Sequence, residues 1–237
     1  MNASNFSKMS PRLLSAAGFV RQGATVADVG SDHAYLPIYL CMQGKIRSAV
    51  ASDINEGPVA RASINVASAH LGKKIKVVRA DGLSGIEEYS PGDIVICGMG
   101  GELIASIIGA AEWTKSPKIR LIMQPMTHAD KLRKFLLDNG YSIVGEALAK
   151  EDKIYQIICA EYRGSTESYS ECELILGKLN ILAASEELFE YAAYVRSVFE
   201  TRLRGKRSAG ADVSEEERII AELDKILEKD GSKNEGT

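Results

Sequence analysis

The chain has 237 residues, of which 45% are hydrophobic and 26% charged, and its net charge is −3. These values are those of an ordinary soluble protein with room for one α/β domain and a small appendage, and the acidic balance argues against a uniformly basic nucleic-acid-binding surface. No apolar run approaches the ~20 residues that span a bilayer, and residues 1–10 lack the apolar core of a signal peptide. The cysteines and histidines have no metal-binding spacing, so we expect a cytoplasmic protein with no metal and no membrane contact.

The first predicted elements are a helix and a strand that ends in a glycine turn. Ser10 is a suitable N-cap and Pro11 suits a first helical turn, so a helix is expected over residues 10–20. The apolar run 26–29 then predicts a buried parallel strand that stops at Gly30, where the missing Cβ lets a ligand approach the backbone. In α/β folds, a strand, a turn and a helix of this kind hold a nucleotide-like ligand.

Asp28, two residues before this glycine, bears on which ligand is bound. A carboxylate repels a pyrophosphate but accepts hydrogen bonds from an ammonium, so the turn favours S-adenosylmethionine, whose amino acid end carries an ammonium, over a dinucleotide. The further glycines of a dinucleotide fingerprint are also missing, because Asp32 and Ala34 stand in their places. A tight turn without any ligand is the alternative for this stretch taken alone.

The next part of the chain alternates between strand and helix patterns. An acid that ends a second strand, here Asp53, bonds ribose hydroxyls in nucleotide-binding folds, and the later pair Asp81-Gly82 is able to bond an adenine amino group. For Asp53 the alternative is a helix cap or a turn residue, and for Asp81-Gly82 it is a plain turn. The expected strands are residues 48–53, 75–79, 93–97 and 120–124, and the expected helices are residues 34–43, 58–70, 101–111 and 128–139.

Two further strands complete the predicted sheet. Residues 141–149 and 154–162 are joined by a short polar segment and are expected to form an antiparallel hairpin. Five earlier strands that alternate with helices predict a doubly wound, Rossmann-like parallel sheet, to which class I methyltransferases usually add a terminal antiparallel strand. We expect this α/β methyltransferase domain over residues 1–163 and a C-terminal helical coiled-coil domain over residues 164–237.

The helical domain is predicted from caps and apolar periodicity. Helices over residues 186–204 and 215–229, joined by a loop over residues 205–213, predict an antiparallel coiled-coil hairpin, and residues 231–237 are expected to be disordered. The spacing of a capping box occurs in Ser170 with Glu173 and in Ser214 with Glu217. The expected apolar stripe is Leu188, Tyr191, Val195 and Val198 on the first helix, and Ile220, Leu223 and Leu227 on the second.

The run from Asp28 to Pro37 resembles the first motif of the bacterial tRNA (adenine-22-N1)-methyltransferases, and the segment from Gly98 to Gly101 resembles their fourth. Gln124-Pro125 and the helical tail match in order and position, so the resemblance covers nearly the whole chain. It implies a class I enzyme that transfers a methyl group from S-adenosyl-L-methionine to N1 of adenine 22 in tRNA. Many members carry Asn where this chain has Met126, which leaves any polar base contact at that position unsupported.

The resemblance also implies which residues bind the two substrates. Asp28 and Gly30 would hold the methionine end of the donor, Asp53 its ribose, and Asp81 with Gly82 its adenine edge. The full set expected to bind the donor is Asp28, Gly30, Ser31, Asp53, Ile54, Asp81, Gly82 and Gly98. The set expected to contact the target base is Met99, Gly100, Gly101, Gln124 and Pro125.

The segment after the strand 93–97 indicates which adenine nitrogen reacts. Enzymes that methylate the exocyclic amine place an Asn/Asp-Pro-Pro-aromatic segment there, whereas this chain has none. N1 of adenine has an in-plane lone pair that attacks a sulfonium methyl without prior deprotonation, so catalysis needs mainly positioning. The catalytic candidates are Asp32, to accept a hydrogen bond from the adenine amine, and His33, to orient the base or a water. The alternative for His33 is a helix-start residue bonded to backbone.

Adenine 22 lies within folded tRNA, so the base must be exposed or flipped, and an extended helical hairpin suits recognition of RNA shape. The expected phosphate contacts at the hairpin tip are Arg202, Arg204, Lys206 and Arg207, and further candidates beside the cleft are Lys8, Arg12 and Arg21. A solvated helix end, where cations offset the helix dipole, is the alternative for the tip.

Two other functions remain open at this stage. A nicotinamide-dependent oxidoreductase uses the same sheet topology, although the missing glycines count against it. A non-catalytic RNA-binding module would keep the fold without chemistry, but such a module has no need for the carboxylates Asp28, Asp53 and Asp81. No obligate protein partner is implied, and the oligomeric state is left open.

Overall fold

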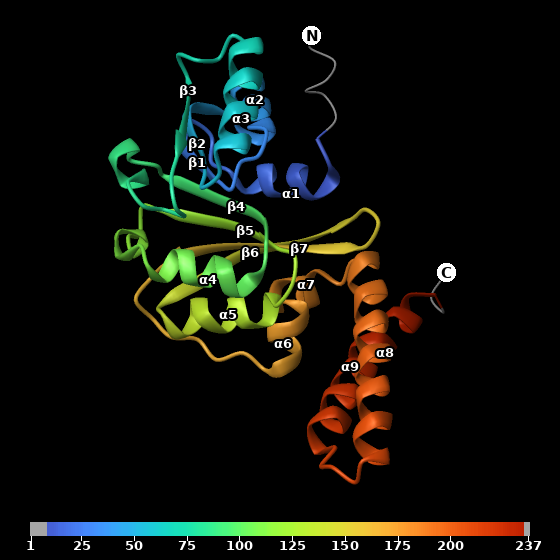
Figure 1. Ribbon diagram of the computed structural model, residues 1–237. Helices are drawn as coiled ribbons and strands as arrows, with labels where there is room; N and C mark the ends of the chain where they lie inside the picture. Colours follow the sequence, from blue (N-terminus) through green and yellow to red (C-terminus); the bar gives the residue numbers. More distant parts are fainter. Residues whose placement is uncertain (1–8, 235–237) are drawn as a thin grey trace. The chain divides into compact units, whose positions relative to one another are not determined.

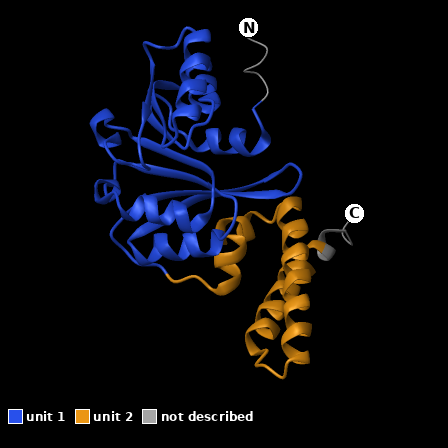
Figure 2. Cartoon of the chain, viewed as in Figure 1, with its two compact units in different colours: residues 1–167 blue, residues 168–237 orange. Residues whose placement is uncertain are grey.

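The structure is a computed structural model that describes the backbone of residues 9–234 and side chains up to residue 230. Figure 1 shows the ribbon, and Figure 2 shows the two compact units into which the chain divides, residues 1–167 and 168–237. Residues 1–8, which include the candidate Lys8, and the last three residues of the tail lie outside the described part. Within that part, no helix is both long enough and apolar enough to cross a membrane.

Unit 1 contains a seven-stranded sheet in the order β3-β2-β1-β4-β5-β7-β6. The first five strands along the chain are parallel, and β7 pairs antiparallel with both β5 and β6. The predicted doubly wound sheet with a terminal antiparallel hairpin is therefore confirmed. The strands are β1 (Ala24–Val29), β2 (Ile46–Asp53), β3 (Ile75–Arg79), β4 (Asp93–Met99), β5 (Arg120–Pro125), β6 (Tyr141–Lys150) and β7 (Ile154–Tyr162).

Helices cover both faces of this sheet (Figure 1). One face carries α1 (Pro11–Phe19), α2 (Tyr35–Met42) and α3 (Glu56–Ser68), and the other carries α4 (Gly101–Gly109) and α5 (Ala129–Asp138). Two short 3-10 helices, η2 (Ile86–Tyr89) and η3 (Glu112–Thr114), lie in the connections. The apolar faces of the first three helices pack with the central strands in one core cluster, as strands buried on both faces require.

The direction of α1 decides which of its flanking cations reach the carboxyl ends of the strands. At the end of α1, the Phe19 carbonyl accepts a hydrogen bond from Arg120, the first residue of β5. At its start, Arg12 Nη1 lies 3.5 Å from the sulfur of Met126, just past the last residue of β5. The helix therefore runs antiparallel to the parallel strands, from their carboxyl ends to their amino ends.

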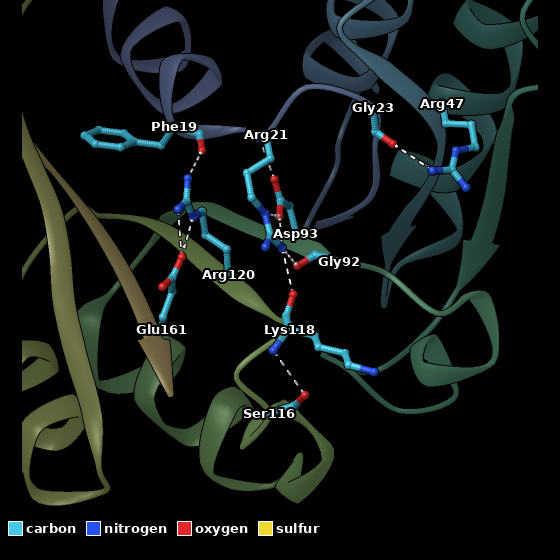
Figure 3. Close-up of polar contacts among 10 residues, drawn as sticks. All are labelled: Phe19, Arg21, Gly23, Arg47, Gly92, Asp93, Ser116, Lys118, Arg120 and Glu161. Carbon is cyan, nitrogen blue, oxygen red and sulfur yellow. Dashed lines mark hydrogen bonds and ion pairs between the residues drawn. The ribbon is translucent and has the colours of Figure 1, made fainter. Parts of the chain in front are cut away.

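Arg21 consequently lies at the amino ends of the strands, and the expectation that it lies beside the cleft is wrong. Its backbone N–H and Nε donate to the two carboxylate oxygens of buried Asp93 at 2.7 and 2.6 Å, and its Nη2 donates to the carbonyls of Gly92 and Lys118 (Figure 3). These contacts tie the entry of β1 to the entries of β4 and β5.

Unit 2 consists of α6 (Glu171–Leu176), α7 (Lys178–Ala183), α8 (Glu186–Ser208) and α9 (Ser214–Asn234). The capping box of Ser170 with Glu173 is confirmed, because each side chain accepts the backbone N–H of the other residue. The box predicted at Ser214 is wrong. Ser214 is the first helical residue, and its N–H and hydroxyl both donate to Asp212, a stronger acceptor two residues earlier.

Both long helices extend further than the sequence pattern predicts. The helix α8 continues to Ser208, so part of the expected loop is helical, and α9 reaches Asn234, so residues 231–234 are helical where disorder is expected. The two helices are antiparallel, because Arg196 pairs with Asp224 and Lys206 with Glu216. Phe189, Ala192, Phe199 and Ile219 are buried, whereas Tyr191, Val198, Ile220 and Leu227 of the predicted stripe are only half-buried. Leu188, Val195 and Leu223 of the predicted stripe are buried as expected, so the packed faces overlap the predicted ones in part.

Candidate active site

The carboxyl ends of β1 and β4 form the topological switch point of the sheet. These strands are neighbours, but the chain continues from β1 to β2 and β3 on one side and from β4 to β5 on the other. Ligands of open α/β sheets bind at such points, outside the carboxyl ends of the strands. The sheet order brings to this edge the strand-end residues that the sequence singled out: Asp28, Asp53, Gly98, Met99 and Gln124.

Asp28 is a buried carboxylate with no cation beside it in the described residues. It is 8% exposed, and its one hydrogen bond comes from the Ser31 hydroxyl. Burial raises the pKa of Asp28 from 3.8 to about 6, and the Ser31 hydrogen bond opposes this shift only in part. A buried charge of this kind is costly unless it is paired, so the site suits a ligand that brings a positive group.

The turn after Asp28 is bare backbone held in a left-handed conformation. Gly30 has φ +74°, and its N–H and that of Ser31 both donate to the Ser52 carbonyl at 2.8 Å. A Cβ at Gly30 would overlap the terminal methyl of Met99, so the methionine side chain lies across the turn. Gly98, with φ +82°, has open space around its missing Cβ. The two turns, called the cradle below, leave bare backbone at the ends of β1 and β4, next to the strand that carries Asp28.

The residues expected to hold the ribose and adenine follow on the β2 and β3 side. Asp53 ends β2 and accepts the N–H of Asn55 through Oδ1 at 2.8 Å, so the turn contact considered as its alternative is present and uses one of its two oxygens. Ile54 is half exposed. Asp81 and Gly82 line a cavity of about 540 Å³, whose other wall includes Leu103 and Ile107 of α4.

The two catalytic candidates lie together and are engaged with α3. Asp32 Oδ1 accepts Arg61 Nε at 2.9 Å, and its Oδ2 lies 3.2 Å from His33 Nε2. The His33 ring stacks on Tyr35 at 4.9 Å, and its carbonyl accepts a hydrogen bond from Asn65. The charge of Asp32 is therefore already balanced by a cation. The sequence did not indicate Arg61, because it lies 29 residues from Asp32 and no local pattern links the two.

The loops after β4 and β5 are interlocked. Gly101 donates its N–H to the Thr127 carbonyl at 2.8 Å, and Met126 donates its own to the Met99 carbonyl at 2.8 Å. A Cβ at Gly101 would overlap the backbone of Thr127 and His128. His128 has φ +54°, and Ala34 in the loop after β1 has φ +55°, which are strained conformations for non-glycine residues. Such strain gathers at functional sites.

We expect Gly101→Ala to destabilise the protein by roughly 1–3 kcal/mol, because the added methyl has only backbone to displace. Thermal unfolding measures the effect. The matched control is Gly18→Ala in α1, where a Cβ meets nothing within 4 Å, and which should leave the melting temperature unchanged or raise it. Equal melting temperatures for the Gly101 variant and the wild type would show that the loops after β4 and β5 can separate without loss of stability.

Gln124 is fully buried at the end of β5. Its Nε2 donates to the Pro125 carbonyl at 3.0 Å and lies 3.6 Å from the sulfur of Met126. Its Oε1 is buried and has no hydrogen-bond partner in the described part of the chain. The sulfur of Met126 thus lies beside a polar amide, although a thioether is only a weak hydrogen-bond acceptor.

The cations at the hairpin tip of unit 2 lie on the last turns of α8. Lys206 and Arg207 are paired with Glu216 and Glu217 of α9, at 2.7 and 2.6 Å. Arg202 and Arg204 are exposed; the first lies over the Phe199 ring, and the second donates to the Thr201 hydroxyl. The exposed arginines are the better candidates for phosphate contacts.

Comparisons with known proteins match this description. The family model of a methyltransferase domain matches residues 9–158. The tRNA (adenine(22)-N(1))-methyltransferase of Bacillus subtilis is 38% identical over 173 residues, which are 73% of each chain. The crystal structure of the B. subtilis m1A22 tRNA methyltransferase TrmK is 30% identical, with a TM-score of 0.78 and coverage of 93% of this chain and 96% of that one. A Streptococcus pneumoniae structure in complex with S-adenosyl-L-methionine is 34% identical, with a TM-score of 0.82 and coverage of 93% and 100%.

The resemblance drawn from the sequence is therefore confirmed over nearly the whole chain. The residues matched by the family model include the β1 turn, the loops after β4 and β5, β6 and the first part of β7. This chain belongs to the tRNA (adenine-22-N1)-methyltransferase family.

Proposed function

We propose that this chain transfers a methyl group from S-adenosyl-L-methionine to N1 of adenine 22 in tRNA. The observation that carries the proposal is the buried carboxylate of Asp28 beside the bare Gly30 turn, at the switch point of the sheet. Membership of the family supports this function over the nicotinamide-dependent oxidoreductase and the non-catalytic RNA-binding module. A cytoplasmic location follows from the tRNA substrate.

The residues around the switch point fit the donor part by part. Asp28 would accept hydrogen bonds from its ammonium, and the bare backbone at Gly30 and Gly98 would lie against its methionine chain. Asp53, through the oxygen not used by Asn55, would accept a ribose hydroxyl. Asp81 and Gly82 would bind the adenine edge of the donor. Ser31 and Ile54 are the remaining residues proposed to bind the donor. When bound, S-adenosyl-L-methionine supplies an electrophilic methyl group on its sulfonium.

The work of the protein in this reaction is mainly positioning. N1 of adenine is a nucleophile without deprotonation, so the base has to be held in line with the methyl carbon and the leaving sulfur. Met99, Gly100 and Gly101, fixed by the contact to the loop after β5, would form one wall for the base. Gln124 and Pro125 are buried, so they would position the loop after β5 rather than touch the base.

Asp32 and His33 are the proposed catalytic residues. Arg61 Nε donates to Oδ1 of Asp32, and the carboxylate of Asp32 would accept a hydrogen bond from the adenine amine as positive charge develops on the base. His33, stacked on Tyr35, would orient the base or a water. Phosphate contacts to the tRNA are proposed for Arg202 and Arg204, with smaller contributions from Lys206 and Arg207.

The experiment incubates the purified protein with methyl-labelled S-adenosyl-L-methionine and unmodified bacterial tRNA, and identifies the labelled nucleoside by mass. We expect labelled 1-methyladenosine, and no label when adenine 22 is replaced by guanine. Label in another nucleoside would keep the donor but contradict the assigned base. A lack of label, together with measured donor binding, would point to another acceptor.

A further inference from the structure

Arg12 carries a guanidinium whose hydrogen-bonding capacity is largely unused. Among the residues that the structure describes, its Nε is buried without a hydrogen-bond partner, and Oε2 of Glu151 lies 3.9 Å from it. Its Nη1 is directed at the sulfur of Met126 at 3.5 Å. A thioether is a weak acceptor for a charged donor, and the same sulfur already receives Nε2 of Gln124. The contacts of this cation are therefore poor for a group with five donors.

The fold holds this guanidinium in place without satisfying it. The Arg12 backbone N–H donates to Glu151 Oε1 at 2.8 Å, and the guanidinium carbon lies 5.0 Å from the centre of the Tyr155 ring. Arg12 also stands in the first turn of α1, where a cation opposes the helix dipole. Helix stability thus does not explain a cation here, whereas an anionic ligand would.

The guanidinium faces the same strand ends as Asp28. Burial and the charge of Asp28 raise the pKa of the Cys97 thiol, and the charge of Arg12 lowers it, so both groups act on one side chain of β4. Asp28 lies on β1 and Met126 follows β5, the two strands that flank β4. Strands are spaced about 4.8 Å apart, so an anion and a cation stand on opposite sides of the β4 end.

We propose that Arg12 binds a substrate oxyanion in this site, either the carboxylate of the methyl donor or a phosphate of the target nucleotide. A planar guanidinium binds both groups through paired hydrogen bonds. The carboxylate is favoured, because an amino acid end presents an ammonium and a carboxylate side by side, matching Asp28 and Arg12. This inference rests on the proposed function.

The experiment measures binding of S-adenosylhomocysteine by calorimetry to the wild type, Arg12→Ala and Arg12→Lys. We expect Arg12→Ala to weaken binding at least about tenfold, as for the loss of a charged hydrogen bond, and Arg12→Lys to restore part of the affinity. Decarboxylated S-adenosylmethionine is the second probe, and Arg12→Ala should leave its affinity unchanged because the carboxylate is absent. The control is Lys118→Ala, an exposed cation at the amino ends of the strands.

A second arm of the experiment distinguishes the phosphate. If Arg12 binds tRNA instead, Arg12→Ala raises KM for tRNA, leaves S-adenosylhomocysteine affinity unchanged, and lowers the slope of log KM against log salt by about 0.7–0.9. Thermal unfolding checks the fold, and Arg12→Gln, which keeps a planar group over Tyr155, replaces the alanine variant if that one does not fold. Unchanged donor affinity together with an unchanged tRNA KM overturns the inference. Absence of binding by the wild type would instead contradict the proposed function.

Discussion

Asp28→Asn is expected to weaken S-adenosyl-L-methionine binding by at least about a hundredfold while making the protein more stable at pH 7.5, by roughly 2–3 kcal/mol. Binding weakens because the buried carboxylate is the anionic partner proposed for the ammonium. Stability rises because an ionised carboxylate that is 8% exposed, with no cation beside it among residues 9–230, is unfavourable in the folded state, and the neutral amide removes that charge. Calorimetry and urea unfolding measure the two effects on the same samples.

The pH dependence gives this prediction a definite sign. The pKa of Asp28 is about 6 in the folded protein against the ordinary 3.8, so the folded state binds the extra proton between these values. Protonation of Asp28 therefore stabilises the folded protein: this contribution is fully present below pH 3.8 and is lost as the pH rises through 6. The free energy of unfolding of the wild type should fall, relative to Asp28→Asn, as the pH is raised from 4 to 7. Donor affinity should change in the opposite direction, decreasing below pH 6.

Asp53→Asn is the matched control for Asp28, because Asp53 is less buried and already accepts the Asn55 N–H. It should weaken donor binding without any gain in stability. An Asp28→Asn protein that binds the donor as tightly as the wild type would contradict the assignment of the amino acid cradle. A protein that is less stable at every pH would show that the Ser31 hydrogen bond outweighs the cost of burial.

Arg133→Met is expected to destabilise the protein by about 3–5 kcal/mol, as for loss of one partner of a buried ion pair. Arg133 is fully buried in α5, and its Nε and Nη2 donate to Glu146 of β6 and Gln156 of β7, each at 2.7 Å. The substitution leaves the carboxylate of Glu146 buried and without this cation. Urea unfolding at pH 7 measures the loss.

Two further variants test whether the charge, rather than the side-chain volume, causes this effect. The double variant Arg133→Met with Glu146→Leu should recover most of the stability, because both charges are then replaced by apolar groups. Lys134→Met, on the exposed side of the same helix where it pairs with Asp138, should change stability by less than about 0.5 kcal/mol. If Arg133→Met costs no more than Lys134→Met, the pair does not hold the β6–β7 hairpin to α5.

Much of the fold, and the placement of the candidate site residues at one edge of the sheet, could be predicted from the sequence because the signals are local. The apolar run before Gly30, the acid at the end of β2 and the glycines after β4 each lie within a few residues of the strand end they mark. Strand ends of a parallel sheet meet at one edge, so the alternation of strands and helices was enough to bring Asp28, Asp53 and Gly98 to that edge. The Ser170 capping box, a pattern of four residues, was likewise predictable.

The contacts that distinguish this site depend on partners far apart in the chain. Arg12 meets Glu151 across 139 residues and Met126 across 114, because α1 runs against the strands; the same direction carries Arg21 to the opposite end of the sheet. The position of Met99 over Gly30 depends likewise on β4 lying beside β1. The sequence by itself determined the elements, their order and the residues at each strand end, since periodicity, caps and glycine turns act over a few residues. Only the tertiary structure decided which charges meet and which remain unpaired, because those contacts arise from the direction and packing of whole elements.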